Sequence, residues 1–134
     1  MTLQYHHKSS GFSLLSFSKS SFRETTIKML LLYRKRSPNL TSFYQTLLYL
    51  VQSYEFDIVL GDFNINALES HPCLSQIFLD YTLSVTEPTH ISGSLLDHCY
   101  INNNLTQIFD ATCHVVTVSF SDHDAVKIQL KPKL

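Results

Sequence analysis

The segment 56–64, Phe-Asp-Ile-Val-Leu-Gly-Asp-Phe-Asn, constrains the fold of this chain more than any other stretch. Its first five residues form a short run with β-branched side chains that Gly61 stops, which predicts a buried strand. A strand buried on both faces needs covering layers, so the segment favours an α/β architecture. Asp62 and Asn64 then follow at the carboxyl end of the strand, where open α/β sheets place their ligands.

Apolar patterning assigns the neighbouring segments. Residues 26–33 form an apolar run that predicts a strand ending at Tyr33 and Arg34. From Leu40, apolar residues recur at helical spacing, which predicts a helix to about Tyr54 with Asn39 or Thr41 as the N-cap. The remaining patterns predict a shorter helix over 73–81, a strand over 95–101, and strands over 114–118 and 125–130.

The length of 134 residues allows a single domain. We expect residues 1–25 to be a poorly defined remnant of an upstream region, because this Ser-rich start shows no clear element. Residues 26–134 carry all the assigned elements. No apolar run approaches the length of about 18–20 residues that a membrane span needs, so we expect no membrane association.

Charge is divided unevenly along the chain. Residues 1–36 contain seven basic side chains and one acidic side chain, a net charge of +6, whereas residues 37–134 contain three basic and ten acidic ones, a net charge of −7. The basic residues 1–36 could bind phosphates and the acidic residues 37–134 could bind cations. A solvated surface explains most of these charged residues equally well. Cys73, Cys99 and Cys113 form no Cys-x-x-Cys pair, so neither a zinc site nor a redox centre is indicated.

Two short motifs contain side chains suited to phosphodiester hydrolysis, which needs a cation, a group that handles water and a group that stabilises charge. Asp62 and Asp122 are the candidate ligands of Mg²⁺, which prefers oxygen donors. Asn64 would share a face with Asp62 if the strand continues. His123 becomes a stronger candidate for stabilising the phosphate if a carboxylate raises its pKa and so makes it a cation. Asp97 is the expected partner; Asp124 is the poorer alternative, because its side chain should point away from its neighbour in a strand.

The order of these motifs resembles that of the endonuclease/exonuclease/phosphatase family. A strand ending in Tyr-Arg, a helix, Gly-Asp-Phe-Asn, Pro-Thr-His with Leu-Leu-Asp-His, and Ser-Asp-His occur in that sequence between residues 26 and 130. The pattern is most similar to the endonuclease domains of eukaryotic mobile elements, such as non-LTR retrotransposons and helicase-bearing transposons. The resemblance implies a two-sheet α/β sandwich with the site at one edge between the sheets.

Roles for single residues follow from this resemblance. It implies that Asp62 handles the attacking water and that Asn64 contacts the phosphate, while Asp122 joins the metal site. His123, paired with Asp97, would bind the phosphoryl oxygens, and Tyr33 would approach the phosphate or the leaving group. The resemblance also implies nucleic-acid contacts by Arg34 and Lys35, for which a solvated turn is an equally good interpretation.

The start of the chain departs from the family pattern. Family members begin with a strand that carries an Asn, followed by a strand whose Glu is a principal metal ligand. The sequence offers Glu24 alone in that region, and we do not assign it the ligand role. We therefore expect a sandwich that lacks its N-terminal strands, with residues 26–134 as the C-terminal part of such a domain.

The resulting hypothesis is a metal-dependent phosphodiesterase that cuts DNA with Mg²⁺ or Mn²⁺, weak or inactive as this fragment. Two alternatives stay open: a non-catalytic remnant, and a phosphodiesterase that acts on a phosphate ester outside nucleic acids. We expect an intracellular protein, nuclear if active, that belongs to a longer polyprotein with a reverse transcriptase or a helicase.

Overall fold

The computed structural model describes residues 2–7, 14–22, 25–36 and 39–133. Three strands come first, β1 (Thr2–His7), β2 (Leu14–Phe22) and β3 (Thr25–Tyr33). Then follow α1 (Leu40–Tyr54), β4 (Ile58–Asp62), α2 (Pro72–Ile77), β5 (Tyr81–Leu83), β6 (Asp97–Asn102), the 3-10 turn η1 (Leu105–Gln107), β7 (Phe109–Val116) and β8 (Ala125–Pro132).

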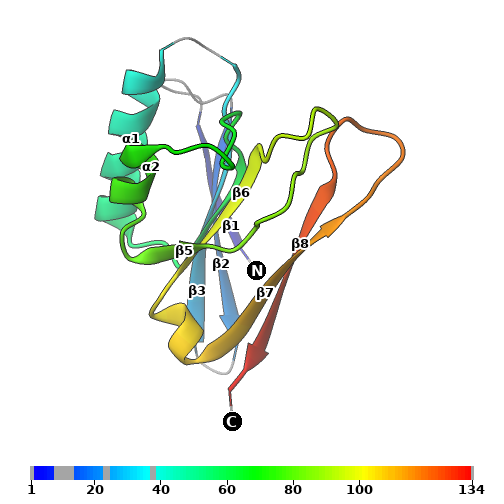
Figure 1. The fold of residues 1–134 in the computed structure, drawn as a ribbon. Coiled ribbons are helices and arrows are strands. Elements are labelled where there is room, and N and C mark those ends of the chain that lie inside the picture. Colours follow the sequence, from blue (N-terminus) through cyan, green and yellow to red (C-terminus); the bar gives the residue numbers. More distant parts are fainter. Residues whose placement is uncertain (1, 8–13, 23–24, 37–38, 134) are drawn as a thin grey trace.

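The strands form two sheets of unequal size. The larger sheet has the order β1-β2-β3-β4-β6-β5, in which β3 and β4 are parallel and the other neighbours are antiparallel. β7 and β8 pair in the smaller, antiparallel sheet. Both helices lie on one side of the larger sheet and β7–β8 on the other (Figure 1). The predicted two-sheet α/β sandwich is confirmed.

Several predicted boundaries differ from the structure. The helix expected over 73–81 ends at Ile77, and Tyr81 begins β5, where the Tyr81 hydroxyl donates to the Phe56 carbonyl. β7 begins at Phe109, five residues before the predicted start. The sequence pattern predicts no element in residues 1–25, yet β1 and β2 lie there. Ser residues at every second position of β2 replace the apolar residues by which a half-buried strand is usually recognised.

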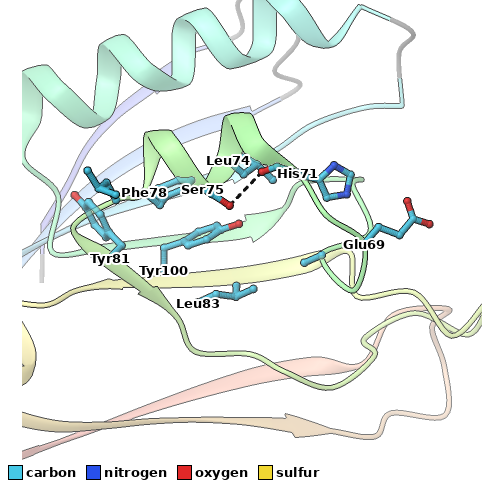
Figure 2. Close-up of a pocket in the computed structure, with 10 residues that line it drawn as sticks. Glu69, His71, Leu74, Ser75, Phe78, Tyr81, Leu83 and Tyr100 are labelled. Carbon is cyan, nitrogen blue, oxygen red and sulfur yellow. Dashed lines mark hydrogen bonds between the residues drawn. The ribbon is translucent and has the colours of Figure 1, made fainter.

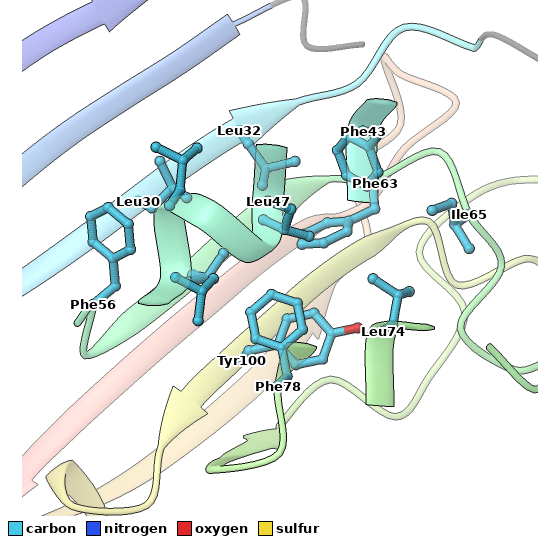
Figure 3. Packing of buried hydrophobic residues seen from close by; sticks show 13 residues of the cluster. Leu30, Leu32, Phe43, Leu47, Phe56, Phe63, Ile65, Leu74, Phe78 and Tyr100 are labelled. Carbon is cyan, nitrogen blue, oxygen red and sulfur yellow. The ribbon is translucent and has the colours of Figure 1, made fainter. Parts of the chain in front are cut away.

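α1 agrees with its predicted range, and Asn39 is its N-cap, accepting a hydrogen bond from the Ser42 N–H. The buried face of the helix packs on the larger sheet, where Phe43 and Leu47 meet Leu30 and Leu32 of β3 (Figure 3). No helix in the described part of the chain is long and apolar enough to cross a membrane.

A second apolar cluster fills the space between the sheets. Ile58 of β4, Cys99 and Ile101 of β6 and Phe109 of β7 are buried there. Side chains alternate between faces along a strand, so Val59 belongs to the helix-side cluster whereas Ile58 and Leu60 face the smaller sheet. Asp62 is two residues beyond Leu60 and therefore continues the inter-sheet face.

Candidate active site

Three neighbouring strands of the larger sheet place polar side chains in one row. Tyr33 of β3 is the register partner of Asp62 on β4, and Asp62 is the register partner of Asp97 on β6. Residues that pair in register project to the same face. A phenol and two carboxylates are thereby gathered at one end of the face that packs against β7 and β8.

His123, from the loop between β7 and β8, closes this row. Its Nδ1 atom lies 2.7 Å from Asp97 Oδ2 and its Nε2 atom lies 3.7 Å from Asp62 Oδ2. All three side chains are partly buried. The predicted partner, Asp97, is the residue in contact, whereas the Asp124 carboxylate accepts a hydrogen bond from the Val118 N–H.

The surroundings of the site shift the pKa values of Asp62 and His123. Burial raises the pKa of Asp62, and the nearby charge of Asp97 adds to the rise, which the hydrogen bond from Asn64 and the charge of His123 oppose. Partial burial lowers the pKa of His123, but the hydrogen bond and charge of Asp97, with the charges of Asp62 and Asp122, outweigh it and leave the pKa raised. The raised pKa favours the protonated form of His123 beside Asp97.

Asp62, Asp97 and His123 each offer a donor atom to a cation, and these atoms lie within 4.8 Å of one another. Asp122 is not in this group, which covers the described residues, and its side chain is exposed. The predicted pairing of Asp122 with Asp62 at a metal stays a prediction, as do the roles assigned to the other site residues.

Asn64 lies beside Asp62 for a different reason than the one expected. β4 ends at Asp62, and the chain turns so that the Asn64 N–H donates to Asp62 Oδ1 at 2.9 Å. This is an Asx turn. Asn64 has a φ of 52°, in the left-handed region, and its side-chain amide donates to the Arg34 carbonyl at 3.5 Å.

The basic residues after β3 have contrasting surroundings. Tyr33 is 43% exposed, whereas Arg34 is only 3% exposed. The Arg34 guanidinium donates to the backbone carbonyls of Phe63 and Asn64, and Lys35 is exposed. The predicted nucleic-acid contacts of Arg34 and Lys35 stay predictions. Glu24 lies outside the described residues.

Two residues of Pro-Thr-His contribute to the site in ways that the motif alone does not predict. The Thr89 hydroxyl is fully buried and accepts from the N–H groups of Leu96 and Asp97. The Thr89 carbonyl accepts from the Asp124 N–H at 2.7 Å. His90 lies against His123, with ring centroids 4.8 Å apart. The motif therefore joins the strand of Asp97 to the loop of His123.

A pocket of about 320 Å³ lies on the helix side of the larger sheet (Figure 2). Phe78 and Tyr100 stack in it with ring centroids 3.7 Å apart, and Glu69 and His71 lie at its polar part. Tyr100 alternates with Cys99 and Asp97 on β6, so this pocket is on the opposite face from Asp97. It does not include the row that ends in His123.

Comparison with solved structures identifies a similar fold. The endonuclease domain of TRAS1, a telomere-specific non-LTR retrotransposon, superposes with a TM-score of 0.72 at 15% sequence identity. The match covers 88% of this chain and 62% of that domain, so the chain spans less than two thirds of its length. No family model and no curated protein sequence matches the chain. The fold is the one that the motif order implied.

Proposed function

We propose that this chain is a metal-dependent phosphodiesterase domain whose substrate is DNA. One observation carries the proposal: His123 lies between Asp97 and Asp62, 2.7 Å and 3.7 Å away, although these residues come from both sheets. The likeness in fold to a retrotransposon endonuclease supports a nuclease-like activity.

Each side chain of the row suits one part of the reaction. Ionised Asp62 accepts a proton from the attacking water or orients that water. Protonated His123, held by Asp97, donates to a phosphoryl oxygen and balances the charge that develops there. Asn64 contacts the phosphate, and the Tyr33 hydroxyl approaches the leaving group from the neighbouring strand.

The donor set fits a divalent cation. Two carboxylates within reach of each other disfavour joint ionisation unless positive charge lies between them. Asp62 and Asp97 would hold Mg²⁺ or Mn²⁺ through oxygen atoms, with water completing the shell. The bound cation would neutralise charge on the phosphoryl oxygens. Asp122 is the alternative ligand, and its replacement by Asn tests that role.

A plasmid-nicking assay with Mg²⁺ or Mn²⁺ tests the proposal. We expect wild-type protein to convert supercoiled plasmid to the nicked form slowly, in keeping with the weak activity expected of this fragment. Asp62→Asn and His123→Gln should each reduce the rate by about 100-fold or more, because each removes a group that interacts with the reacting atoms. Chelation with EDTA should abolish nicking in every preparation.

Asp110→Asn is the matched control, since the Asp110 carboxylate is 68% exposed on β7. It should nick at the wild-type rate. Nicking that survives both Asp62→Asn and His123→Gln contradicts the proposal. So does a wild-type chain that unfolds cooperatively yet neither nicks DNA nor releases heat on Mg²⁺ titration, which is the behaviour of a non-catalytic remnant.

We further propose that the chain acts in the nucleus as the DNA-cutting domain of a mobile-element polyprotein. This polyprotein would also contain a reverse transcriptase or a helicase. Translation of the genomic sequence on both sides of the coding region tests this setting, because it would reveal or exclude such neighbours.

A further inference from the structure

The loop from Asp62 to Ile65 has an unusual set of hydrogen bonds. Its four successive carbonyls all accept one: Asp62 from the Arg34 N–H at 2.8 Å, Phe63 from Arg34 Nε at 2.7 Å, Asn64 from Arg34 Nη2 at 2.8 Å and Ile65 from His98 Nε2 at 2.8 Å. Loop carbonyls on a protein surface are commonly left to water. Here two residues, Arg34 and His98, account for all four bonds.

Arg34 reaches the loop from β3, and its surroundings suit a structural role. The residue is 3% exposed, and its guanidinium carbon lies 5.4 Å from the centre of the Phe43 ring. Burial lowers the pKa of Arg34, because a buried charge is costly. The planar guanidinium donates in two directions at a fixed angle, which a lysine cannot reproduce. The carbonyls of Phe63 and Asn64 accept from the guanidinium at positions that fit this two-pronged geometry.

His98 holds the other end of the loop from the helix side of the larger sheet. It is 1% exposed and its ring stacks on Phe63, with centroids 4.3 Å apart and planes 12° from parallel. Because the Ile65 carbonyl can only accept, Nε2 must be the protonated nitrogen, and Nδ1 accepts from the Tyr100 hydroxyl. Burial lowers the pKa of His98 to about 4, so this neutral tautomer persists at neutral pH.

The backbone between these two anchors makes a tight turn. Asn64 adopts a φ of 52°, in the left-handed region that Asn adopts more readily than other residues apart from Gly. The same turn directs the Asn64 N–H onto the Asp62 carboxylate. If the turn relaxed, the orientation of both site residues would change together.

We propose that Arg34 and His98 are positioning residues that fix Asp62 and Asn64 by holding the loop carbonyls from opposite ends. This inference rests on the proposed function for its catalytic consequence. Neither side chain touches the substrate. Arg34 then acts from inside the protein, in contrast to the contact with a nucleic-acid backbone that the family resemblance implied.

Arg34→Lys tests the role of Arg34 in the reaction, because it keeps the positive charge and loses the paired donors of the guanidinium. Plasmid nicking should show kcat reduced roughly 10- to 100-fold, as when a group that orients an active-site residue is lost, with KM unchanged. The salt dependence of DNA binding should equal that of the wild type. In Arg34→Ala, added methylguanidinium should restore part of kcat. A control, Lys127→Gln on exposed β8, should change neither constant.

Amide hydrogen exchange tests the loop directly and needs no activity. Relative to the wild type, Arg34→Lys should raise exchange at Phe63 and Asn64 about three- to tenfold, the factor for one ordinary hydrogen bond, while Val59 in β4 is unchanged. His98→Phe keeps a ring against Phe63 but loses the donor, so it should give the same rise. His98→Gln, whose amide can donate in place of Nε2, should restore protection.

Three outcomes separate the two proposals. If the wild type does not nick DNA but exchange changes as expected, the proposed function fails and the positioning role stands. If Arg34→Lys raises KM and lowers the salt dependence of binding, Arg34 contacts phosphate and the positioning role is overturned. Wild-type exchange in both His98→Phe and Arg34→Lys also overturns it, and should Arg34→Lys not fold, the two His98 variants decide alone.

Discussion

His123 derives its charge from the carboxylates around it. Asp97 accepts from one ring nitrogen and Asp62 lies near the other. These carboxylates favour the imidazolium form, so the pKa of His123 is higher than that of an isolated histidine. Because the folded-state pKa is raised above 6.5, His123 contributes stability below that pH, and the contribution is lost as pH rises through the folded-state pKa.

Asp97→Asn should lower the pKa of His123, because it removes the hydrogen-bonded carboxylate and its charge. An NMR titration of the His123 ring in metal-free buffer measures the change. Asp110→Asn should leave the titration unaltered. If the pKa of His123 were the same in Asp97→Asn as in the wild type, the assigned partnership would be wrong.

Asp62 should determine the acidic limb of the dependence of the nicking rate on pH. Since burial raises its pKa, nicking should decline with falling pH earlier than for a carboxyl of ordinary pKa 3.8, while loss of the His123 proton limits the alkaline side. A bell-shaped dependence of kcat/KM on pH is expected. In Asp97→Asn the alkaline limb should move to lower pH, and an unmoved limb would assign it to another group.

Gly61 is required by backbone contact between β3 and β4. It has a φ of 145°, and a Cβ atom there would lie 1.8 Å from the Leu32 carbonyl oxygen. Gly61→Ala should lower the free energy of unfolding by about 2–4 kcal/mol, measured by urea denaturation. Gly93→Ala is the comparison: its φ is 87° but the space around it is open, so only backbone strain of about 1 kcal/mol applies.

Residue identities predicted some of these relations and not others. The expected orientation of Asp124, away from His123, favours Asp97 as the partner, and the contact agrees. The burial of Arg34 was not predictable, because it begins a run of basic residues that reads as exposed. Only the register of β3 with β4 places its side chain over the loop that follows Asp62.

Among the elements, α1 was predictable because its pattern is complete. An N-cap, a helical repeat of apolar residues and a length of 15 residues all agree. β5 was missed because it has only three residues, which are too few to show a period. The predicted helix over 73–81 wrongly included Tyr81, because Phe78 and Tyr81 also fit helical spacing. In the structure α2 ends at Ile77 and Tyr81 begins β5, where it packs against Phe78 and donates to the Phe56 carbonyl.

Leu47 and Leu48 provide a matched test of how α1 is oriented. Leu47 is fully buried against the larger sheet, whereas Leu48 is 38% exposed. Leu47→Ala should lower the free energy of unfolding by about 2–5 kcal/mol, because it leaves a cavity. Leu48→Ala should cost less than about 1 kcal/mol. Chemical denaturation measures both, and equal losses would contradict the packing of the helix.

At the scale of the whole molecule, the candidate site joins the two sheets. The α/β class and the meeting of Tyr33 and Asp62 at one edge were predictable, because buried parallel strands direct their carboxyl ends to one edge. The order of strands and the docking of β7–β8 were not, since both depend on contacts between distant segments. Two sheets of six and two strands were therefore found only in the structure.

Binding of a cation should stabilise the whole domain. At a Mg²⁺ or Mn²⁺ concentration 100 times the dissociation constant, the folded state gains about 2.7 kcal/mol, and Tm rises accordingly. The rise should vanish in Asp62→Asn and persist in Asp110→Asn. A thermal melt with and without the cation measures it, and an equal rise in both variants would place the bound ion elsewhere.

The connection of the site across two sheets also determines when it forms during folding. β7 and β8 pair locally, whereas contact of His123 with Asp62 closes a long stretch of chain, and such closures come at an entropic cost that delays them. Until the hairpin docks, two carboxylates face each other without their imidazolium partner. Docking of the β7–β8 hairpin, which completes the site, should therefore be faster at pH values at which His123 is protonated.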